Sequence, residues 1–292
     1  MSEQRLRIAV QKSGRLADKS LELLESAGLR VIKGANELLY RIENAPIDVL
    51  RVRDDDIPTF VADGVAALGI VGYNVLQERN GDAAHTPVEL MQLGFGRCTL
   101  KIAAPEGFAY SGPHTLDGAR IATSYPNILR KFLDKHGVAA EIVLMKGAVE
   151  VAPRLKLAQV ICDLVSTGAT LEANGLAAVE TVLTSEAVLI SAPTPIAPEL
   201  APIRDSFIAR VRGVIASRGA KYVMMNAPRA ALAKITSILP GADAPTVTPL
   251  AGREDTVAVH AVCQESVFWE TLERLKAAGA SAILVMPIEK MM

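Results

Sequence analysis

Apolar and polar residues alternate between two periods along the first 200 or so positions. Short apolar runs at 6–10, 47–52 and 68–72 predict buried strands. Between the first two runs, apolar residues at helical spacing end at Gly28, and Pro58 opens a further helix. Strands that alternate with helices predict an α/β fold of mostly parallel strands, with ligand sites at their carboxyl ends.

The same pattern repeats in the middle of the chain. Apolar runs at 120–123 and 160–165 predict two more strands, and residues 128–133 have helical spacing. The proline-rich segment 193–198 fits neither a helix interior nor a central strand, so it ends the alternation. A helix over about 200–218 follows.

The C-terminal segment has an order of its own. Strand and helix patterns follow as strand, helix, strand, strand, helix, strand, at 221–226, 228–239, 246–250, 256–262, 266–278 and 282–287. This βαββαβ order is typical of a ferredoxin-like domain. We expect a small regulatory or assembly domain attached to the α/β body.

Composition narrows the class of protein. The chain has 292 residues, 50% hydrophobic and 22% charged, which suffices for the cores of two or three domains. Its 31 basic and 32 acidic residues argue against a globally basic nucleic-acid binder. No apolar run approaches the roughly 18 residues of a membrane helix, and residues 1–7 lack the apolar segment of a signal peptide. Three widely spaced cysteines fit reduced thiols, so we expect a cytoplasmic protein.

The most informative segment is 160–172, where an apolar strand ends at Asp163 and a loop leads into a helix. The loop is rich in hydroxyl groups and small residues, namely Ser166, Thr167, Gly168, Ala169 and Thr170. Hydroxyl and backbone N–H donors at a helix start suit a phosphate, and the carboxylate suits two ribose hydroxyls. An ordinary strand-to-helix turn with a threonine N-cap is the alternative that spacing alone leaves open.

The loop 163–170, DLVSTGAT, resembles the phosphoribosyl-pyrophosphate loop of the ATP phosphoribosyltransferases, the first enzymes of histidine biosynthesis. Further segments are similar to that family along nearly the whole chain: 8–16, 50–58, 122–126, 147–154 and, for the extra domain of the long form, 268–290. The resemblance implies that N1 of the ATP adenine displaces pyrophosphate from C1 of phosphoribosyl pyrophosphate, giving phosphoribosyl-ATP. It also implies Mg²⁺, inhibition by histidine, and assembly from dimers to hexamers.

The resemblance further implies a two-lobed, periplasmic-binding-protein-like catalytic body with a C-terminal ferredoxin-like regulatory domain. We expect residues 1–97 plus about 177–218 in catalytic lobe I. Lobe II, with the phosphoribosyl-pyrophosphate loop, is expected over 98–176. A histidine-binding regulatory domain is expected over 219–292.

Charge development in the implied reaction assigns the first candidate residues. Departure of pyrophosphate builds positive charge on the ribose ring, which the Asp163 carboxylate can stabilise. Lys12, Arg15 and Arg53 are candidate partners of the anionic leaving group. The attacking nitrogen has a free lone pair, so no general base is assigned. Taken without the family, Lys12 and Arg15 also fit solvated surface cations.

Further candidates follow from the resemblance. Glu150 joins the loop as a phosphoribosyl-pyrophosphate ligand, although an acid in a first helical turn is the plain alternative. The expected nucleotide-binding residues are Arg15, Arg53, Asp54, Gly72 and Asn74. Asp54 lies in an acidic run that equally suits a helix start, and the metal ligands stay unassigned.

Effector contacts are expected at Thr246, Ala280 and Ser281, where small groups could hold histidine between subunits. Turn and strand-edge positions are the alternative for each. The competing function is a non-catalytic two-lobed protein that binds a phosphosugar or nucleotide. The absence of a signal segment and of a helix-turn-helix ahead of the first strand argues against a secreted receptor and a transcription regulator.

Overall fold

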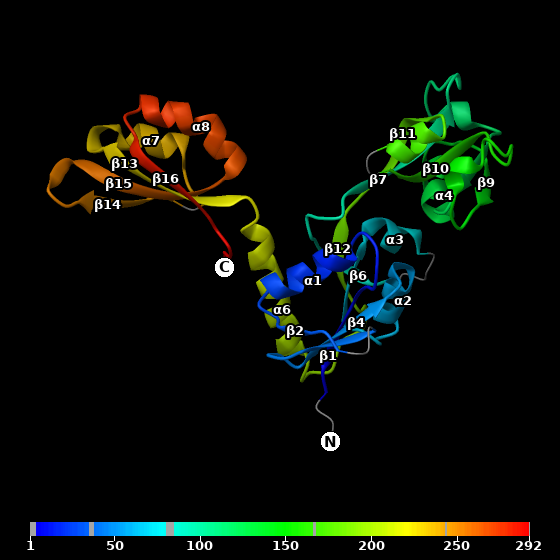
Figure 1. Cartoon of the computed structure of the whole chain (residues 1–292), viewed down its shortest axis with the longest axis horizontal. Helices are drawn as coiled ribbons and strands as arrows, with labels where there is room; N and C mark the ends of the chain where they lie inside the picture. The colour runs from blue at the N-terminus through cyan, green and yellow to red at the C-terminus, as the bar shows by residue number, and fades with distance from the viewer. Residues whose placement is uncertain (1–3, 35–37, 80–84, 166–167, 243, 292) are drawn as a thin grey trace. The chain divides into compact units, whose positions relative to one another are not determined.

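The computed structural model describes residues 4–34, 38–79, 85–165, 168–242 and 244–291. The chain divides into two compact units, Met1–Ser206 and Phe207–Met292, which are described separately. Figure 1 traces both units from the N-terminus to the C-terminus. Within the described ranges, no helix combines the length and apolar character needed to cross a membrane.

The first unit contains two sheets. The described strands of the first sheet follow the order β2-β3-β4-β1-β5-β12-β6. Their bounds are β1 Leu6–Gln11, β2 Val31–Ile32, β3 Leu39–Ile42, β4 Ile47–Val52, β5 Leu68–Gly72, β6 Val88–Gln92 and β12 Ala187–Ser191. Strand β1 is parallel to β4 and β5, whereas β3 and β12 are antiparallel to their neighbours. The sheet is therefore mixed, because β3 and the returning strand β12 run opposite to the other strands.

Helices pack against this sheet: α1 Ala17–Ser26, the 3₁₀ turn η1 Asp54–Asp56, α2 Ile57–Ala62 and α3 Tyr73–Glu78. Pro58 lies in the first turn of α2, as predicted, where its missing N–H leaves no bond unmade. A Cβ on Gly69 would lie 2.8 Å from side-chain atoms of both Ile57 and Val61. The glycine in β5 therefore lets α2 approach the sheet closely and bury these residues beside it.

The second sheet follows the order β11-β7-β10-β8-β9. Its strands are β7 Cys98–Pro105, β8 Arg120–Thr123, β9 Glu141–Leu144, β10 Val160–Val165 and β11 Leu176–Ser185, with η3 Pro113–Leu116, α4 Pro126–Lys135, η4 Val149–Val151 and α5 Ala169–Ala173 around it. Strand β10 is parallel to β8, as predicted for a site-bearing strand, and antiparallel to β7. Ile102, Ile121 and Leu129 are buried between this sheet and its helices.

The chain crosses from the first sheet to the second between β6 and β7 and returns between β11 and β12. Two lobes joined by two crossovers are the arrangement of periplasmic-binding-protein-like folds, so the expected body is confirmed. Strand β11 pairs with β7 in the second sheet. Residues 177–185, which we assigned to lobe I, therefore lie in lobe II, because pairing along β7 holds this strand.

The second unit is a four-stranded antiparallel sheet with the order β14-β15-β13-β16. Its elements are the end of α6 (Ala201–Ala216), β13 Ala220–Pro228, η5 Arg229–Ala231, α7 Leu232–Ile238, β14 Thr246–Leu250, β15 Arg253–Gln264, α8 Glu265–Ala277 and β16 Ser281–Pro287. Helices α7 and α8 lie on one side of the sheet (Figure 1), where Val223, Ile235 and Leu275 are buried together. The predicted ferredoxin-like order is confirmed.

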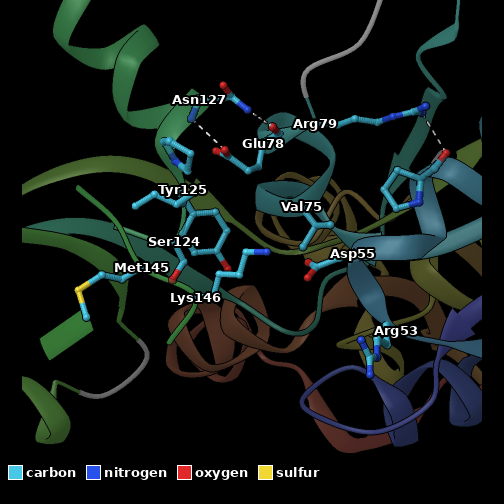
Figure 2. A pocket seen from close by; sticks show the side chains of 13 residues that line it. Arg53, Asp55, Val75, Glu78, Arg79, Ser124, Tyr125, Asn127, Met145 and Lys146 are labelled. Carbon is cyan, nitrogen blue, oxygen red and sulfur yellow. Dashed lines mark hydrogen bonds between the residues drawn. The ribbon is translucent and has the colours of Figure 1, made fainter. Parts of the chain in front are cut away.

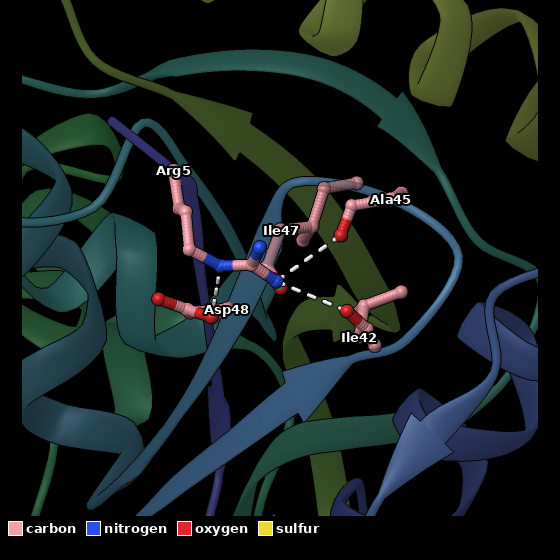
Figure 3. A network of polar contacts seen from close by, with 5 residues as sticks. All are labelled: Arg5, Ile42, Ala45, Ile47 and Asp48. Carbon is pink, nitrogen blue, oxygen red and sulfur yellow. Dashed lines mark hydrogen bonds and ion pairs between the residues drawn. The ribbon is translucent and has the colours of Figure 1, made fainter. Parts of the chain in front are cut away.

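A single arginine closes the amino-terminal end of the first sheet. The Arg5 guanidinium donates to Asp48 Oδ1 at 2.8 Å and to the carbonyl oxygens of Ile42, Ala45 and Ile47 at 3.0, 3.1 and 2.8 Å (Figure 3). These carbonyls belong to the end of β3, the turn after it and the start of β4, so Arg5 ties the two strands together where they are joined.

Replacing Arg5 with alanine should therefore destabilise the first unit. Loss of a charged donor that serves several part-buried acceptors should lower the free energy of unfolding by about 2–3 kcal/mol. Urea unfolding of the full chain measures this. Arg7→Ala is the matched control, because Arg7 is exposed on the same strand and should change the free energy by less than about 0.5 kcal/mol. Equal effects of the two substitutions would contradict the assigned role of Arg5.

Candidate functional site

Asp163 lies near the carboxyl end of β10, where the sequence predicts a ligand site. The carboxylate is half-buried, and its Oδ1 accepts a hydrogen bond from the Leu164 N–H at 2.8 Å. Burial raises the pKa of Asp163, and the negative charge of Glu150 raises it further. The site therefore holds a carboxylate whose charge is poorly compensated in the absence of a ligand.

Glu150 reaches this position from a tight turn. It lies in the first turn of the short 3₁₀ helix η4, as the plain alternative held. Gly147 and Ala148, the residues before η4, have φ values of 146° and 49°, which bend the chain sharply after Lys146. The turn brings Glu150 within electrostatic range of Asp163, so two of the predicted carboxylates share one edge of the second sheet.

The predicted phosphate loop is described in part. Ser166 and Thr167 lie outside the described residues. Gly168 is the N-cap of α5 with φ of 86°, a left-handed conformation that glycine adopts without strain. The N-cap is thus a glycine and not a threonine, while Ala169 and Thr170 are exposed in the first turn.

Lys12 and Arg15 follow β1 in the first lobe. The Lys12 carbonyl accepts a hydrogen bond from the Arg51 guanidinium at 2.6 Å, which fixes the start of this loop. The Lys12 residue is half-buried and Arg15 is exposed. Both therefore lie at the carboxyl end of the first sheet, where β4 ends beside β1.

Arg53 and the acidic run follow β4 at the same edge. Arg53 is exposed, Asp54 is half-buried, and the run forms η1 ahead of α2. Burial raises the pKa of Asp55, and the neighbouring charges of Asp54 and Asp56 raise it further. The acids thus occupy a helical start, as the plain alternative held, and Asp55 also lines a pocket shared with the second lobe.

Gly72 and Asn74 are buried at the start of α3. Asn74 is 2% exposed. Its Oδ1 accepts from Ser185 Oγ at 2.8 Å, and its Nδ2 donates to the Tyr125 hydroxyl at 3.2 Å. A Cβ on Gly72 would lie 2.5 Å from Asn74 Oδ1, so the glycine makes room for this amide. Both predicted nucleotide residues therefore have a packing role of their own.

Acidic residues of both lobes affect the pKa of Tyr125. Burial raises the pKa of its hydroxyl above the ordinary value, and the hydrogen bond from Asn74 opposes this. The negative charges of Asp163 from the second lobe, and of Asp54 and Asp55 from the first, add to the increase. The predicted residues of the two lobes are thus close enough to act on one side chain.

A pocket of about 660 Å³ lies at this junction (Figure 2). Its first-lobe lining includes Arg53, Asp55, Glu78 and Arg79, and its second-lobe lining is Ser124, Tyr125, Pro126, Asn127, Leu144, Met145 and Lys146. Figure 2 shows the Lys146 side chain pointing towards the Asp55 carboxylate from the other lobe.

Sequence reasoning missed Glu78, Arg79 and Lys146 as site residues. The one local signal was the lysine directly before Gly147, because a cation ahead of a glycine turn can present its charge to an anion.

The described residues contain no group of three or more His, Cys, Asp or Glu side chains that could hold a metal ion. Mg²⁺ is commonly held by one or two carboxylates together with substrate phosphates and water. The pair Asp163 and Glu150 fits that donor set.

The predicted effector residues do not meet within one chain. Thr246 begins the edge strand β14, and Ser281 begins β16 at the opposite edge of the sheet. Three strand spacings separate these strands, roughly 14 Å. Ala280 is buried in the core of the second unit.

Comparisons with known proteins agree along the chain. The sequence profile of the ATP phosphoribosyltransferase family (HisG) matches residues 53–212, and the profile of the HisG C-terminal domain matches residues 217–290. An ATP phosphoribosyltransferase of Maricaulis maris (strain MCS10) is 54% identical over 290 residues, covering 99% of both chains. The chain belongs to the ATP phosphoribosyltransferase family. Its reaction is transfer of the phosphoribosyl group of phosphoribosyl pyrophosphate to N1 of ATP, the first step of histidine biosynthesis.

A solved structure supports the fold of the two-lobed body. A chain of the ATP phosphoribosyltransferase (HisG:HisZ) complex of Thermotoga maritima is 24% identical, with a TM-score of 0.58. The match covers 71% of the present chain and 98% of the other chain. The family membership decides against the non-catalytic binding protein as the competing function.

Because the Asp163 charge is poorly compensated, we expect that its removal stabilises the folded protein. Its pKa is raised in the folded protein, so ionisation of Asp163 weakens folding as the pH rises from the unfolded value of 3.8 through the folded value. At pH 7, Asp163→Asn should raise the melting temperature by about 2 °C.

The difference should shrink as the pH falls through the raised pKa of Asp163 and vanish below 3.8, where the side chain is neutral in both states. Thermal unfolding at several pH values measures it, with Asp63→Asn, on an exposed residue after α2, as the control. A variant less stable than the parent at pH 7 would show that the Asp163 charge is compensated in the free protein.

Proposed function

We propose that Asp163 and Glu150 bind the ribose of phosphoribosyl pyrophosphate, and that the turn at Gly168, Ala169 and Thr170 binds its phosphate. The observation that carries this proposal is the convergence of both lobes on Tyr125, beside the half-buried carboxylate of Asp163. The position of Gly168 as the N-cap of α5 supports a phosphate contact through backbone N–H groups. Ser166 and Thr167 stay predictions from the sequence.

ATP occupies the first-lobe side of the same space in this proposal. Arg53 lines the pocket, and Asp54 lies at the same carboxyl edge. Gly72 and Asn74 then shape the wall against which the nucleotide packs. Lys12, Arg15 and Arg53 supply positive charge for the departing pyrophosphate, because charge-assisted hydrogen bonds to phosphate oxygens are strong.

The chemistry needs position more than proton transfer. The adenine N1 lone pair forms the new bond to C1 of the ribose as the bond to pyrophosphate breaks, and the electron pair leaves with pyrophosphate. Asp163 faces the positive charge that develops on the ribose ring. Holding two polyanions in line between the lobes reduces the entropy cost of their meeting.

Mg²⁺ belongs to the same proposal. When bound, the metal neutralises phosphate charge and orients the leaving pyrophosphate. Asp163 and Glu150 are the described residues that would hold it, together with substrate oxygens.

The second unit is proposed as the regulatory domain that binds histidine. Thr246 and Ser281 lie on opposite edges of its sheet, so a site that uses both requires two copies of the chain. The homo-oligomer, dimer to hexamer, thereby becomes part of the regulatory proposal. A cytoplasmic location, where ATP and phosphoribosyl pyrophosphate are made, completes it.

Asp163→Asn should lower kcat by about 100-fold, because the neutral amide cannot stabilise the developing positive charge. Pyrophosphate release from ATP, phosphoribosyl pyrophosphate and Mg²⁺ measures the change. Asp63→Asn should keep the parental rate. Full turnover by Asp163→Asn would remove this carboxylate from the chemistry.

Thr246→Val and Ser281→Ala test the regulatory site. Each removes one hydroxyl without adding bulk, so the histidine concentration for half inhibition should rise about three- to tenfold. Turnover without histidine separates a regulatory effect from damage to the fold. Unchanged inhibition in both variants would rule out these hydroxyls as histidine ligands.

A further inference from the structure

Helix α3 presents two polar side chains to the second lobe. Asn74 and Glu78 are four residues apart, so they lie on the same face of the helix. Asn74 donates to the Tyr125 hydroxyl at 3.2 Å. The two Glu78 carboxylate oxygens accept from the backbone N–H groups of Asn127 and Ile128 at 2.8 and 2.9 Å.

Glu78 supplies what the start of α4 lacks. The first N–H groups of a helix have no acceptor within the helix, and a residue at its own N-cap usually provides one. Tyr125, the N-cap of α4, makes no capping hydrogen bond with its side chain. The carboxylate that caps α4 therefore comes from the other lobe, and the Asn127 side chain donates back to the Glu78 carbonyl at 2.8 Å (Figure 2).

The other end of α3 is held by the returning crossover. The Tyr73 N–H donates to the Glu186 carbonyl at 2.9 Å, and the Asn74 N–H donates to Ser185 Oγ at 2.9 Å. The outgoing crossover contains Gly94 and Gly96, whose φ values are 68° and 66°. Changes in such segments let lobes rotate about a hinge, so α3 spans from the hinge to the mouth of the pocket.

We propose that α3 is an interlobe clasp and that Glu78 is a positioning residue for the transferase reaction. By capping α4, Glu78 holds residues 124–127 against the first lobe, where they line one side of the pocket. The clasp favours the closed arrangement before both substrates are bound. Less substrate binding free energy is then used to close the lobes. The proposal rests on the proposed placement of the substrates between the lobes.

Burial and charge at Glu78 fit this role. Burial raises the pKa of its carboxyl group, while the backbone hydrogen bonds from Asn127 and Ile128 and the Lys131 charge lower it. A carboxylate half removed from water, with both oxygens engaged across the lobes, makes a contact that is lost when the lobes separate.

Glu78→Gln is the test in the full chain. The amide keeps one acceptor but turns an N–H donor towards a backbone N–H, so the cap is lost on one side. We expect KM for both substrates to rise about tenfold and kcat to change less than about threefold, because saturating substrates still close the lobes. Glu22→Gln, on an exposed residue of α1, should keep the parental constants.

A second readout reports on the clasp itself. Amide hydrogen exchange at Asn127 and Ile128 should become faster in Glu78→Gln, since both N–H groups share the altered acceptor. Glu78→Asp keeps both acceptors on a shorter side chain, so its KM should rise less than that of Glu78→Gln. It also keeps the test open if the glutamine variant fails to fold.

Three outcomes would overturn the clasp. A lower melting temperature with unchanged KM would make Glu78 a structural cap only, and a higher kcat with unchanged KM would make the contact a brake on opening. Unchanged exchange at Asn127 and Ile128 would remove the contact itself. The Asp163→Asn result separates the two proposals: a loss of kcat there with no effect at Glu78 removes the clasp alone. An effect on KM at Glu78 with full turnover in Asp163→Asn removes the proposed catalytic carboxylate alone.

Discussion

The cap that Glu78 places on α4 is the contact on which the site depends. A helix start needs acceptors for its free N–H groups, and here they come from a different sheet. The two lobes are otherwise joined through crossovers that begin and end beside the first sheet. The Glu78 cap and the hydrogen bond from Asn74 together hold Tyr125 near the acids of both lobes. A backbone requirement at the start of α4 therefore contributes to the geometry of the cleft.

The ionised carboxylates of Asp163 and Glu150 reduce the stability of the folded protein. Asp163 is partly buried on β10, and Glu150 adds a second negative charge nearby. Such an arrangement weakens folding, since charges are costly to bury without a partner. In the proposed mechanism the same Asp163 carboxylate is useful, because the reaction builds positive charge on the ribose ring beside it.

Features that depend on local sequence patterns could be predicted, whereas strand pairing between distant segments could not. The strands β1, β4, β5, β8 and β10 and the βαββαβ order of the second unit followed from periodicity, because each signal lies within a few residues. The pairing of β11 with β7 depends on residues far apart in sequence, so 177–185 was assigned to the other lobe. Strand order likewise separates Thr246 from Ser281, although each position looked suitable by itself.

The same distinction holds for the residues of the candidate site. Asp163 and the loop behind it were visible because a carboxylate, hydroxyls and small residues follow one strand without interruption. Glu78 was invisible, because a lone glutamate at the end of a short helix has no motif, and its role exists only in relation to α4. Asn74 came from the resemblance as a nucleotide ligand, and its contacts with Tyr125 and Ser185 could be found only in three dimensions.

Strand β1 has one further consequence. Arg5 precedes its first residue and Lys12 follows its last. A six-residue strand, roughly 20 Å long, therefore separates the Arg5 contacts with the β3–β4 turn from the proposed substrate residues. Substitutions that stabilise the amino-terminal end can raise the tolerance of the lobe to destabilising changes without moving the residues proposed to bind the substrates. Added stability at that end of the sheet would offset the destabilising effect of substitutions at the opposite edge. New specificities could therefore evolve there without unfolding the lobe.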